Sequence, residues 1–345
     1  MFNENEYIIQ GEPTTNEKAK NWRIAIGLQD VDGLKPSNYL IETANKNISG
    51  EIDINEAEKR INAYYEHMDV RSDDYHKQEA DKVSIAISKI LAEDAFVFSV
   101  SEFLSIQRRL FAEIADIQLW AGKIRKCNIS KKEWALNNDS VKYAPCESLV
   151  NALEIDFNIE KNFDFKGLNK KQIAQHIAKF TSDIWQLHPF REGNTRAVAV
   201  FIIKYLRMLG FDIGNEQFEN HSWYFRNAMV RNNYENLANG IYRTDKFLNM
   251  FFENMLLDGE NELRNRYLHI DFDRSKVGIN ATSGNKVGII AEFVKKFGQI
   301  TNNDVMNLFD IGREQARKVL VKLVSEGALK AEGGNKNRVD KIKED

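Results

Sequence analysis

The chain has 345 residues, 43% of them hydrophobic and 29% charged, which is enough for a sizeable core and for more than one domain. Its formal net charge of −3 lacks the positive excess of a dedicated nucleic-acid binder, and no stretch approaches the roughly 18 apolar residues of a membrane span. The two cysteines, Cys127 and Cys146, make no disulfide or metal framework. The N-terminus lacks a secretory signal pattern, so we expect a cytoplasmic protein, with export by a specialised secretion system left open.

Four prolines in the whole chain and few alternating stretches predict a mainly α protein. Apolar residues at helical spacing predict three short helices in the first 70 residues, the second of them capped by Ser37. The helices predicted after these lie at about 78–120 (one or two), 146–156, 169–187, 194–209, 221–235 and 244–257. Residues 120–149 alternate polar and apolar side chains around the turn residues Asn137, Asn138 and Asp139, and this pattern predicts a β-hairpin.

The composition changes after Asp271, where Gly, Ser and Asn are frequent and predict a linker. The following segment predicts three helices, a strand, a Gly-Gly turn and a second strand, which is the order of a winged helix-turn-helix domain. Its third helix, REQARKVLVKLVSEG, occupies the recognition position. Residues 281–345 contain 12 Lys/Arg and 9 Asp/Glu, a modest excess, so DNA contact and protein contact both stay open for this domain.

The nine residues HPFREGNTR, at 188–196, gather groups that a structural turn does not need. Residues 193–195 lie where a loop enters a helix, so their backbone N–H groups and the helix dipole favour an anion. Arg196 in the first helical turn is badly placed for that dipole unless a phosphate lies there. Glu192 beside phosphates predicts a Mg²⁺ ligand, and His188 predicts the general base that activates a hydroxyl. We therefore expect a nucleoside triphosphate site.

HPFREGNTR resembles the signature of Fic-domain proteins, His-Pro-Phe-x-Asp/Glu-Gly-Asn-Gly-Arg-x-x-Arg, and the resemblance covers roughly residues 10–260. It implies a helical core with a β-hairpin flap at about 120–149 and transfer of AMP from ATP, with Mg²⁺, to a Ser, Thr or Tyr hydroxyl of a target protein. His188 would take the proton of that hydroxyl, which attacks the α-phosphorus, and Glu192 would hold the metal. The residues that the resemblance implies for nucleotide binding are Gly193, Asn194, Thr195, Arg196, Asn233 and Tyr234. Those that it implies for docking of the target at the flap are Ile129, Ser130 and Lys131.

Two positions depart from the signature. Thr195 stands where the family has Gly, and Ala199 stands where it has its second Arg. The resemblance gives this Arg a contact with the γ-phosphate, and a charge-assisted contact of that kind is worth roughly 1.5–3 kcal/mol. Use of another nucleotide, or transfer of another phosphate-containing group, therefore stays an alternative.

The segment LQDVDGLKPS, at 28–37, resembles the inhibitory region of Fic proteins, whose pattern is Ser/Thr-x-x-x-Glu-Gly/Asn. Leu28 replaces the Ser/Thr, Asp32 replaces the Glu, and Gly33 keeps the last position. In the family this Glu pairs with the second Arg, so both ends of the inhibitory salt bridge are altered here. We expect the N-terminal helices to pack on the core, with inhibition that is weak or uses other contacts. A purely structural lid is the alternative.

These features predict four regions: an N-terminal helical region at 1–75, a Fic core at 76–260, a linker at 261–284 and a winged helix at 285–345. The expected function is protein adenylylation (AMPylation). The alternative is a winged-helix regulator whose Fic domain has become a nucleotide sensor. The expected partner is a target protein. Self-modification, a homo-oligomer and DNA bound by the winged helix stay open, and no membrane partner is expected.

Overall fold

The computed structural model describes residues 13–66, 72–213, 216–272, 290–291, 293–294, 299–309, 311, 313–332 and 339–342. The chain divides into two compact units, a larger one of residues 1–133 and 138–263 and a smaller one of residues 134–137 and 264–345. None of the described helices is long and apolar enough to cross a membrane.

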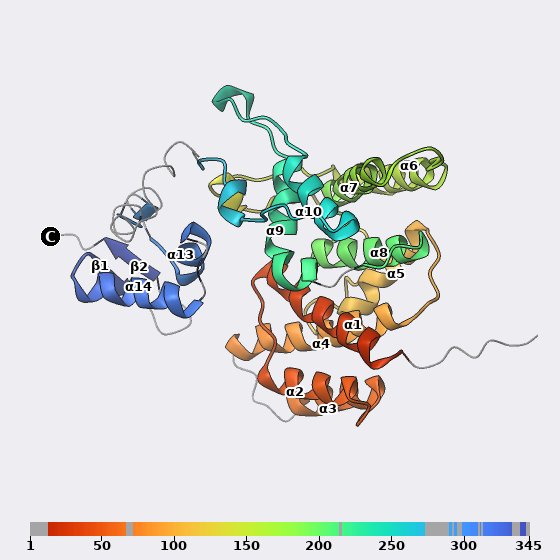
Figure 1. The fold of residues 1–345 in the computed structure, drawn as a ribbon, viewed down its shortest axis with the longest axis horizontal. Helices are drawn as coiled ribbons and strands as arrows, with labels where there is room; N and C mark the ends of the chain where they lie inside the picture. The colour runs from red at the N-terminus through yellow and green to blue at the C-terminus, as the bar shows by residue number, and fades with distance from the viewer. Residues whose placement is uncertain are drawn as a thin grey trace, which may run out of the picture. The chain divides into compact units, whose positions relative to one another are not determined.

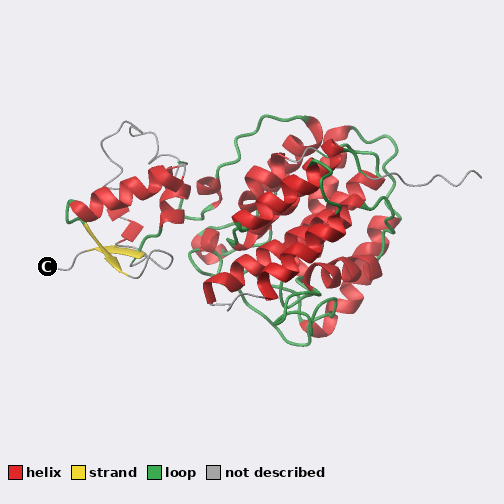
Figure 2. Cartoon of the chain, turned by 90° about the horizontal axis from the view of Figure 1, so that it is seen from below, coloured by secondary structure: helices red, strands yellow, loops and turns green. Residues whose placement is uncertain are grey.

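The larger unit is built from helices, in agreement with the sequence. Figure 1 labels them in chain order, and Figure 2 shows how little of the regular structure is strand. The helices are α1 (Thr15–Gly27), α2 (Asn38–Ile48), α3 (Ile54–Glu66), α4 (Ser72–Ala92), α5 (Val100–Phe111), α6 (Leu149–Lys161), α7 (Lys170–Leu187), α8 (Asn194–Met208), α9 (Glu216–Asn232) and α10 (Lys246–Leu257).

Helix α8 is the centre of the larger unit. Every residue from Asn194 to Leu206 is buried, because a helix that is apolar on nearly all faces must be covered on all sides. It contacts α4, α5, α7 and the short 3₁₀ helix η1 (Leu28–Asp32). The aromatic rings that pack around Phe201 are those of Phe96, Phe98, Phe103 and Phe157. This packing fixes the position of the N-terminal end of α8, where the loop 188–193 enters it.

The N-terminal helices share the same core. Helix α1 packs against α4 and α9, and the buried Trp22 donates from Nε1 to Asn47 Oδ1 over 2.9 Å. Ser37 caps α2 as predicted, since its Oγ accepts from the Leu40 amide. The same hydroxyl donates to Asp81 Oδ2 on α4 over 2.5 Å. The expectation that the N-terminal helices pack on the core is confirmed.

The prediction of two β-strands at 120–149 is wrong. All of these residues are described, and none of them lies in a strand. The predicted turn is present, because Asn137 and Asn138 have left-handed φ values of 55° and 64°. Beyond the turn, side chains bind backbone groups that a strand ladder would pair, as where the Lys131 amide donates to Ser140 Oγ over 3.1 Å. We keep the name flap for residues 120–149.

In the smaller unit, the tip of the flap binds the segment that follows residue 263. The Ile270 amide donates to the Ala135 carbonyl over 2.9 Å, and Asn137 Nδ2 donates to Asp271 Oδ2 over 2.6 Å. Residues 264–272, at the start of the predicted linker, are therefore tied to residues 134–137 of the flap. Residues 273–284 of that linker lie outside the described residues.

The rest of the smaller unit contains α13 (Asn302–Phe309), α14 (Arg313–Ser325), β1 (Leu329–Glu332) and β2 (Val339–Ile342). The two strands are antiparallel, with Leu329 opposite Ile342. The buried core consists of Ile290, Val294, Ile300, Val305, Ala316, Leu320, Leu323 and Leu329. The order of α13, α14, β1 and β2 agrees with the last two helices and the two strands of the prediction, and the first predicted helix lies mostly outside the described residues. The winged-helix assignment and the four region boundaries stay predictions. The Gly-Gly turn between the strands lies outside the described residues.

Candidate active site

The loop between α7 and α8 has a backbone conformation that few sequences permit. His188, which follows the last residue of α7, has φ 49° and ψ 57°. Gly193, at the N-cap of α8, has φ 74°, and a Cβ at this position would lie 2.1 Å from the ring of Phe111. A glycine is therefore required there. The first N–H groups of α8 have no partner within the helix, and such groups form a site for an anion.

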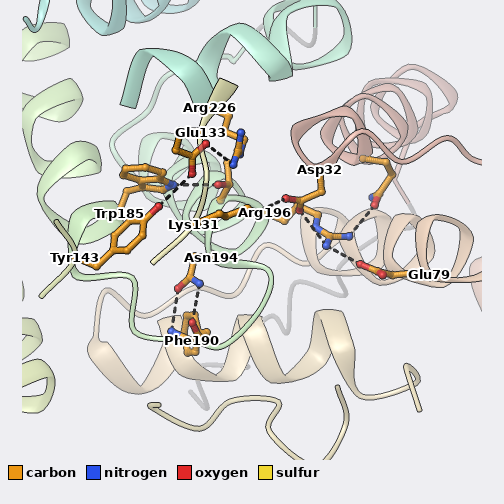
Figure 3. Close-up of polar contacts among 12 residues, drawn as sticks. Asp32, Glu79, Lys131, Glu133, Tyr143, Trp185, Phe190, Asn194, Arg196 and Arg226 are labelled. Carbon is orange, nitrogen blue, oxygen red and sulfur yellow. Dashed lines mark hydrogen bonds and ion pairs between the residues drawn. The ribbon is translucent and has the colours of Figure 1, made fainter. Parts of the chain in front are cut away.

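Asn194 closes the loop with its side chain (Figure 3). Its Oδ1 accepts from the Phe190 amide over 2.9 Å, and its Nδ2 donates to the Phe190 carbonyl over 2.8 Å. The Phe190 ring is fully buried. Because Asn194 Oδ1 and one of the two Nδ2 protons are used within the loop, this side chain holds the loop closed.

His188 is buried, with 6% of its surface exposed. Its Nδ1 lies 3.2 Å from the Trp185 carbonyl, which can only accept, so Nδ1 carries the proton and Nε2 is left with a free lone pair. Burial lowers the pKa of His188 to about 3, the hydrogen bond to Trp185 opposes this shift, and the positive charges of Lys131, Arg226 and Arg125 add to it. At neutral pH the imidazole is therefore uncharged and can accept a proton at Nε2.

Arg196 is enclosed by groups from the N-terminal part of the chain (Figure 3). One guanidinium nitrogen lies 2.7 Å from Glu79 Oε1 and 3.1 Å from Asp32 Oδ2. The other terminal nitrogen donates to Gln29 Oε1 over 3.1 Å, and the guanidinium lies 4.9 Å from the centre of the Phe111 ring. With 1% of its surface exposed, Arg196 has its charge shared between two carboxylates.

Asp32 meets Arg196 and not Ala199, the residue at the position of the missing second Arg. A second contact joins Asp32 Oδ1 to Lys131 Nζ of the flap, 3.4 Å away. Burial raises the pKa of Asp32, but the charges of Arg196 and Lys131 outweigh it and lower that pKa to about 2. Gly33 has φ 69° and ends η1. The sequence analysis expected inhibition that is weak or uses other contacts. The Asp32–Arg196 ion pair is a contact other than the family's salt bridge, and its inhibitory role stays a prediction.

Glu192 is the residue that could hold a metal ion. Its side chain is exposed and has no hydrogen-bond partner among the described residues, while its carbonyl accepts from Gln107 Nε2 over 3.1 Å. No cluster of three or more His, Cys, Asp or Glu side chains suited to a metal occurs in the described part of the chain. Mg²⁺ is commonly bound by one or two carboxylates together with substrate phosphates. A free carboxylate beside an anion site therefore fits this metal.

The Fic/DOC family model matches residues 97–206, which include the flap, α7 and most of α8. These residues form a Fic domain. The chain is 28% identical over 180 residues to Protein adenylyltransferase VbhT of Bartonella schoenbuchensis, over 51% of this chain and 35% of VbhT. It is also 24% identical to Probable protein adenylyltransferase Fic of Escherichia coli, over 45% of this chain and 74% of the relative. The chain thus spans about a third of the first of these relatives.

Two solved structures are also similar to the chain. The N-terminal FIC domain of Bep8 from Bartonella sp. 1-1C is 16% identical, with a TM-score of 0.42 over 55% of this chain and 88% of that one. BepC from Bartonella tribocorum, solved with AMPPNP bound, is 17% identical, with a TM-score of 0.41 over 54% of this chain and 87% of that one.

The two departures of the Fic signature have different surroundings. The Thr195 hydroxyl accepts from Trp185 Nε1 over 3.0 Å, so the branched side chain is bound to the end of α7. Ala199 is fully buried within α8. Thr195 therefore gains a local hydrogen bond, whereas nothing at position 199 replaces the charge of the family's second Arg.

The nucleoside and flap residues predicted for the Fic domain make contacts of their own. Asn233 Nδ2 donates to Ser182 Oγ over 2.7 Å, and the Tyr234 hydroxyl donates to Asp139 Oδ2 of the flap over 2.6 Å. In the flap, Ile129 is half-buried, and the flanking Ser130 and Lys131 are exposed. The binding roles of these five predicted residues stay predictions.

The sequence analysis missed several residues that surround His188 and Arg196. These are Gln29, Glu79, Arg125, Glu133, Tyr143 and Arg226. Glu79 and Arg226 lie in helices whose pattern shows only that one face is apolar. Glu133 is an acidic residue within an alternating segment, and it is fully buried. Among these residues it is the one whose burial the alternating pattern could have indicated.

Proposed function

We propose that the chain is a protein adenylyltransferase, which transfers AMP from ATP to a Ser, Thr or Tyr hydroxyl of a target protein with Mg²⁺. The two relatives named protein adenylyltransferase support this proposal. The observation that carries it is the state of His188. Its imidazole is buried and uncharged, its Nδ1 is bound to Trp185, and it lies next to the loop that presents the N–H groups of α8.

In the proposed reaction, Nε2 of His188 takes the proton of the target hydroxyl while that oxygen attacks the α-phosphorus. The bond from the α-phosphorus to the oxygen that bridges to the β-phosphate breaks, and pyrophosphate leaves. The N–H groups of residues 194–196 stabilise the charge on the phosphates, and so does Arg196 once its carboxylate partners release it. Glu192 would hold Mg²⁺, which when bound neutralises charge on the phosphates.

The test is incubation with Mg²⁺ and α-³²P-labelled ATP, GTP, UTP or CTP, each alone and with a cell lysate. We expect label from ATP on protein with the wild type and none with His188→Ala. His76→Ala is the matched control, because His76 is exposed, and it should label as the wild type does. Label from another nucleotide alone would replace AMP in the proposal. ATP binding without label would overturn it and support the nucleotide sensor.

We also propose that the N-terminal segment restrains the site by holding Arg196. The support is Asp32, which together with Glu79 of α4 neutralises a guanidinium that would otherwise meet the nucleotide phosphates. The alternative of a structural lid predicts that neutral substitutions at these acids leave the labelling rate unchanged.

The smaller unit supports DNA contact as a second candidate function. The exposed residues of α14 include Gln315, Arg317, Lys318 and Lys322, which suit phosphates and base edges. We expect the affinity for a random duplex, measured by fluorescence anisotropy, to fall with added salt and to fall further in Lys318→Ala with Lys322→Ala. Unchanged affinity in that variant would favour a protein partner. We also propose a cytoplasmic location, self-modification and a homo-oligomer.

A further inference from the structure

The imidazole of His188 is enclosed by two aromatic rings. The ring of Tyr143 lies over its face, with 4.0 Å between the centres and 32° between the planes. The indole of Trp185 meets the imidazole edge-on, with 5.2 Å between the centres and 89° between the planes. The hydrogen bond from Nδ1 to the Trp185 carbonyl holds one edge of the imidazole, and Tyr143 covers the face that this bond leaves free to tilt.

Tyr143 is itself held by a buried ion pair (Figure 3). Its hydroxyl donates to Glu133 Oε1 over 3.2 Å, and Glu133 Oε2 lies 2.7 Å from a guanidinium nitrogen of Arg226 on α9. Glu133 is fully buried and Arg226 is 4% exposed. Burial of two charges is costly unless each keeps a partner, so Glu133 is held between Arg226 on one side and the Tyr143 hydroxyl on the other.

The flap does not depend on Tyr143 for its attachment, because Arg125 already fastens both of its ends. The guanidinium of Arg125 donates to the carbonyl oxygens of Cys127 and Ala144 in the flap. It also donates to the carbonyl oxygens of Leu187, the last residue of α7, and of His188 in the loop. Since Arg125 attaches the flap, the hydrogen bond between Tyr143 and Glu133 serves to orient the tyrosine ring.

We propose that Tyr143, oriented by Glu133 and Arg226, is a positioning residue that fixes the plane of the His188 imidazole, so that Nε2 points toward the target hydroxyl. This inference rests on the proposed function for its role in catalysis. Its structural part, a single orientation and tautomer of His188, can be measured without any reaction.

The test compares Tyr143→Leu, Tyr143→Phe and Glu133→Gln in the full chain, with Tyr242→Leu as the matched control because Tyr242 is 68% exposed. The first readout is the ¹⁵N spectrum of the His188 ring. The second is the initial rate at which the protein is labelled by α-³²P-ATP, measured over a range of ATP concentrations. Circular dichroism checks that each variant is folded, and Tyr143→Phe, which loses one oxygen, keeps the test open if the leucine variant does not fold.

We expect a single tautomer with protonated Nδ1 in the wild type and in Tyr242→Leu, and averaged nitrogen shifts in Tyr143→Leu. The labelling rate at saturating ATP should fall at least tenfold in Tyr143→Leu and about threefold in Tyr143→Phe and Glu133→Gln, with the half-saturating ATP concentration changed less than twofold. A folded Tyr143→Leu with the wild-type spectrum and rate would overturn the inference. If the wild type labels nothing, the ¹⁵N spectra alone decide the positioning, and only the proposed function fails.

Discussion

The loop at 188–196 and the flap at 120–149 meet at His188, but they are held in different ways. In the loop the side chains of Asn194 and Thr195 make local contacts, with the backbone of Phe190 and with the indole of Trp185, ten residues away. In the flap they span the chain, since Glu133 pairs with Arg226 and the tip binds residues 264–272. Local contacts therefore set part of the loop conformation, beside the distant contacts of Gln107, Phe111 and Arg125, whereas the flap depends on the assembled fold.

Removal of the positive charge of Arg226, which pairs with Glu133 of the flap, should give the largest loss of stability. Arg226→Met leaves Glu133 buried without a counter-charge, and we expect the free energy of unfolding to fall by about 3–5 kcal/mol at pH 8. Burial raises the pKa of Glu133 and Arg226 opposes that shift, so the carboxyl of the variant should take up a proton in the folded state more readily than in the unfolded state. The loss should therefore shrink as the pH falls from 8 to 5.

Urea titrations at the two pH values measure this effect. Arg243→Met is the control, because its ion pair with Glu235 is exposed and worth at most about 1 kcal/mol. An equal loss in the two variants would show that the buried pair does not hold the flap.

The second largest loss of stability should come from a substitution in the loop that strains its backbone. Gly193→Ala forces a Cβ against the Phe111 ring at a left-handed φ. We expect a loss of about 2–4 kcal/mol from overpacking and backbone strain together. Gly210→Ala shares the positive φ but has open space around its Cβ, so it should lose only the strain part. If both variants lost the same stability in urea, the contact with Phe111 would not shape the loop.

Release of Arg196 from its carboxylates should have a smaller effect, and this effect should be a gain in the labelling rate and not a loss of stability. Asp32→Asn and Glu79→Gln each remove one carboxylate from the guanidinium, and we expect the labelling rate at low ATP to rise about three- to tenfold. This is less than a whole charge-assisted contact of roughly 1.5–3 kcal/mol would give, because the other carboxylate stays. Asp30→Asn, in the same turn of η1 but with no contact to Arg196 among the described residues, is the control. Rates that are unchanged or reduced in both acid variants would leave the N-terminal segment as a structural lid.

The smallest expected change is the effect of pH on the rate. Burial lowers the pKa of His188 to about 3, so the base stays neutral from pH 8 down to pH 5, and the labelling rate at saturating ATP should change less than threefold. A histidine with the ordinary pKa of about 6.5 would lose about thirtyfold by pH 5. A loss of that size, measured as initial rates at constant ionic strength, would mean that water reaches the imidazole.

The same contrast explains what could be predicted from the sequence. The helical core and the loop at 188–196 were predictable because apolar spacing and the residues His188, Gly193 and Asn194 act on their own neighbourhood. The flap was predicted as strands because alternation shows that side chains face two ways, but not which partner each meets. The contacts of Arg196 with Glu79 and Asp32 were hidden for the same reason, since they join residues more than 100 positions apart in the chain.

The proposed transfer of AMP is tested most directly by the position of the label in ATP. Transfer of AMP keeps the α-phosphorus and releases the γ-phosphorus with pyrophosphate. We therefore predict that the wild type places label on protein from α-³²P-ATP but not from γ-³²P-ATP, and that His188→Ala places none from either. Label from γ-³²P-ATP, or label from α-³²P-ATP that persists in His188→Ala, would contradict the account.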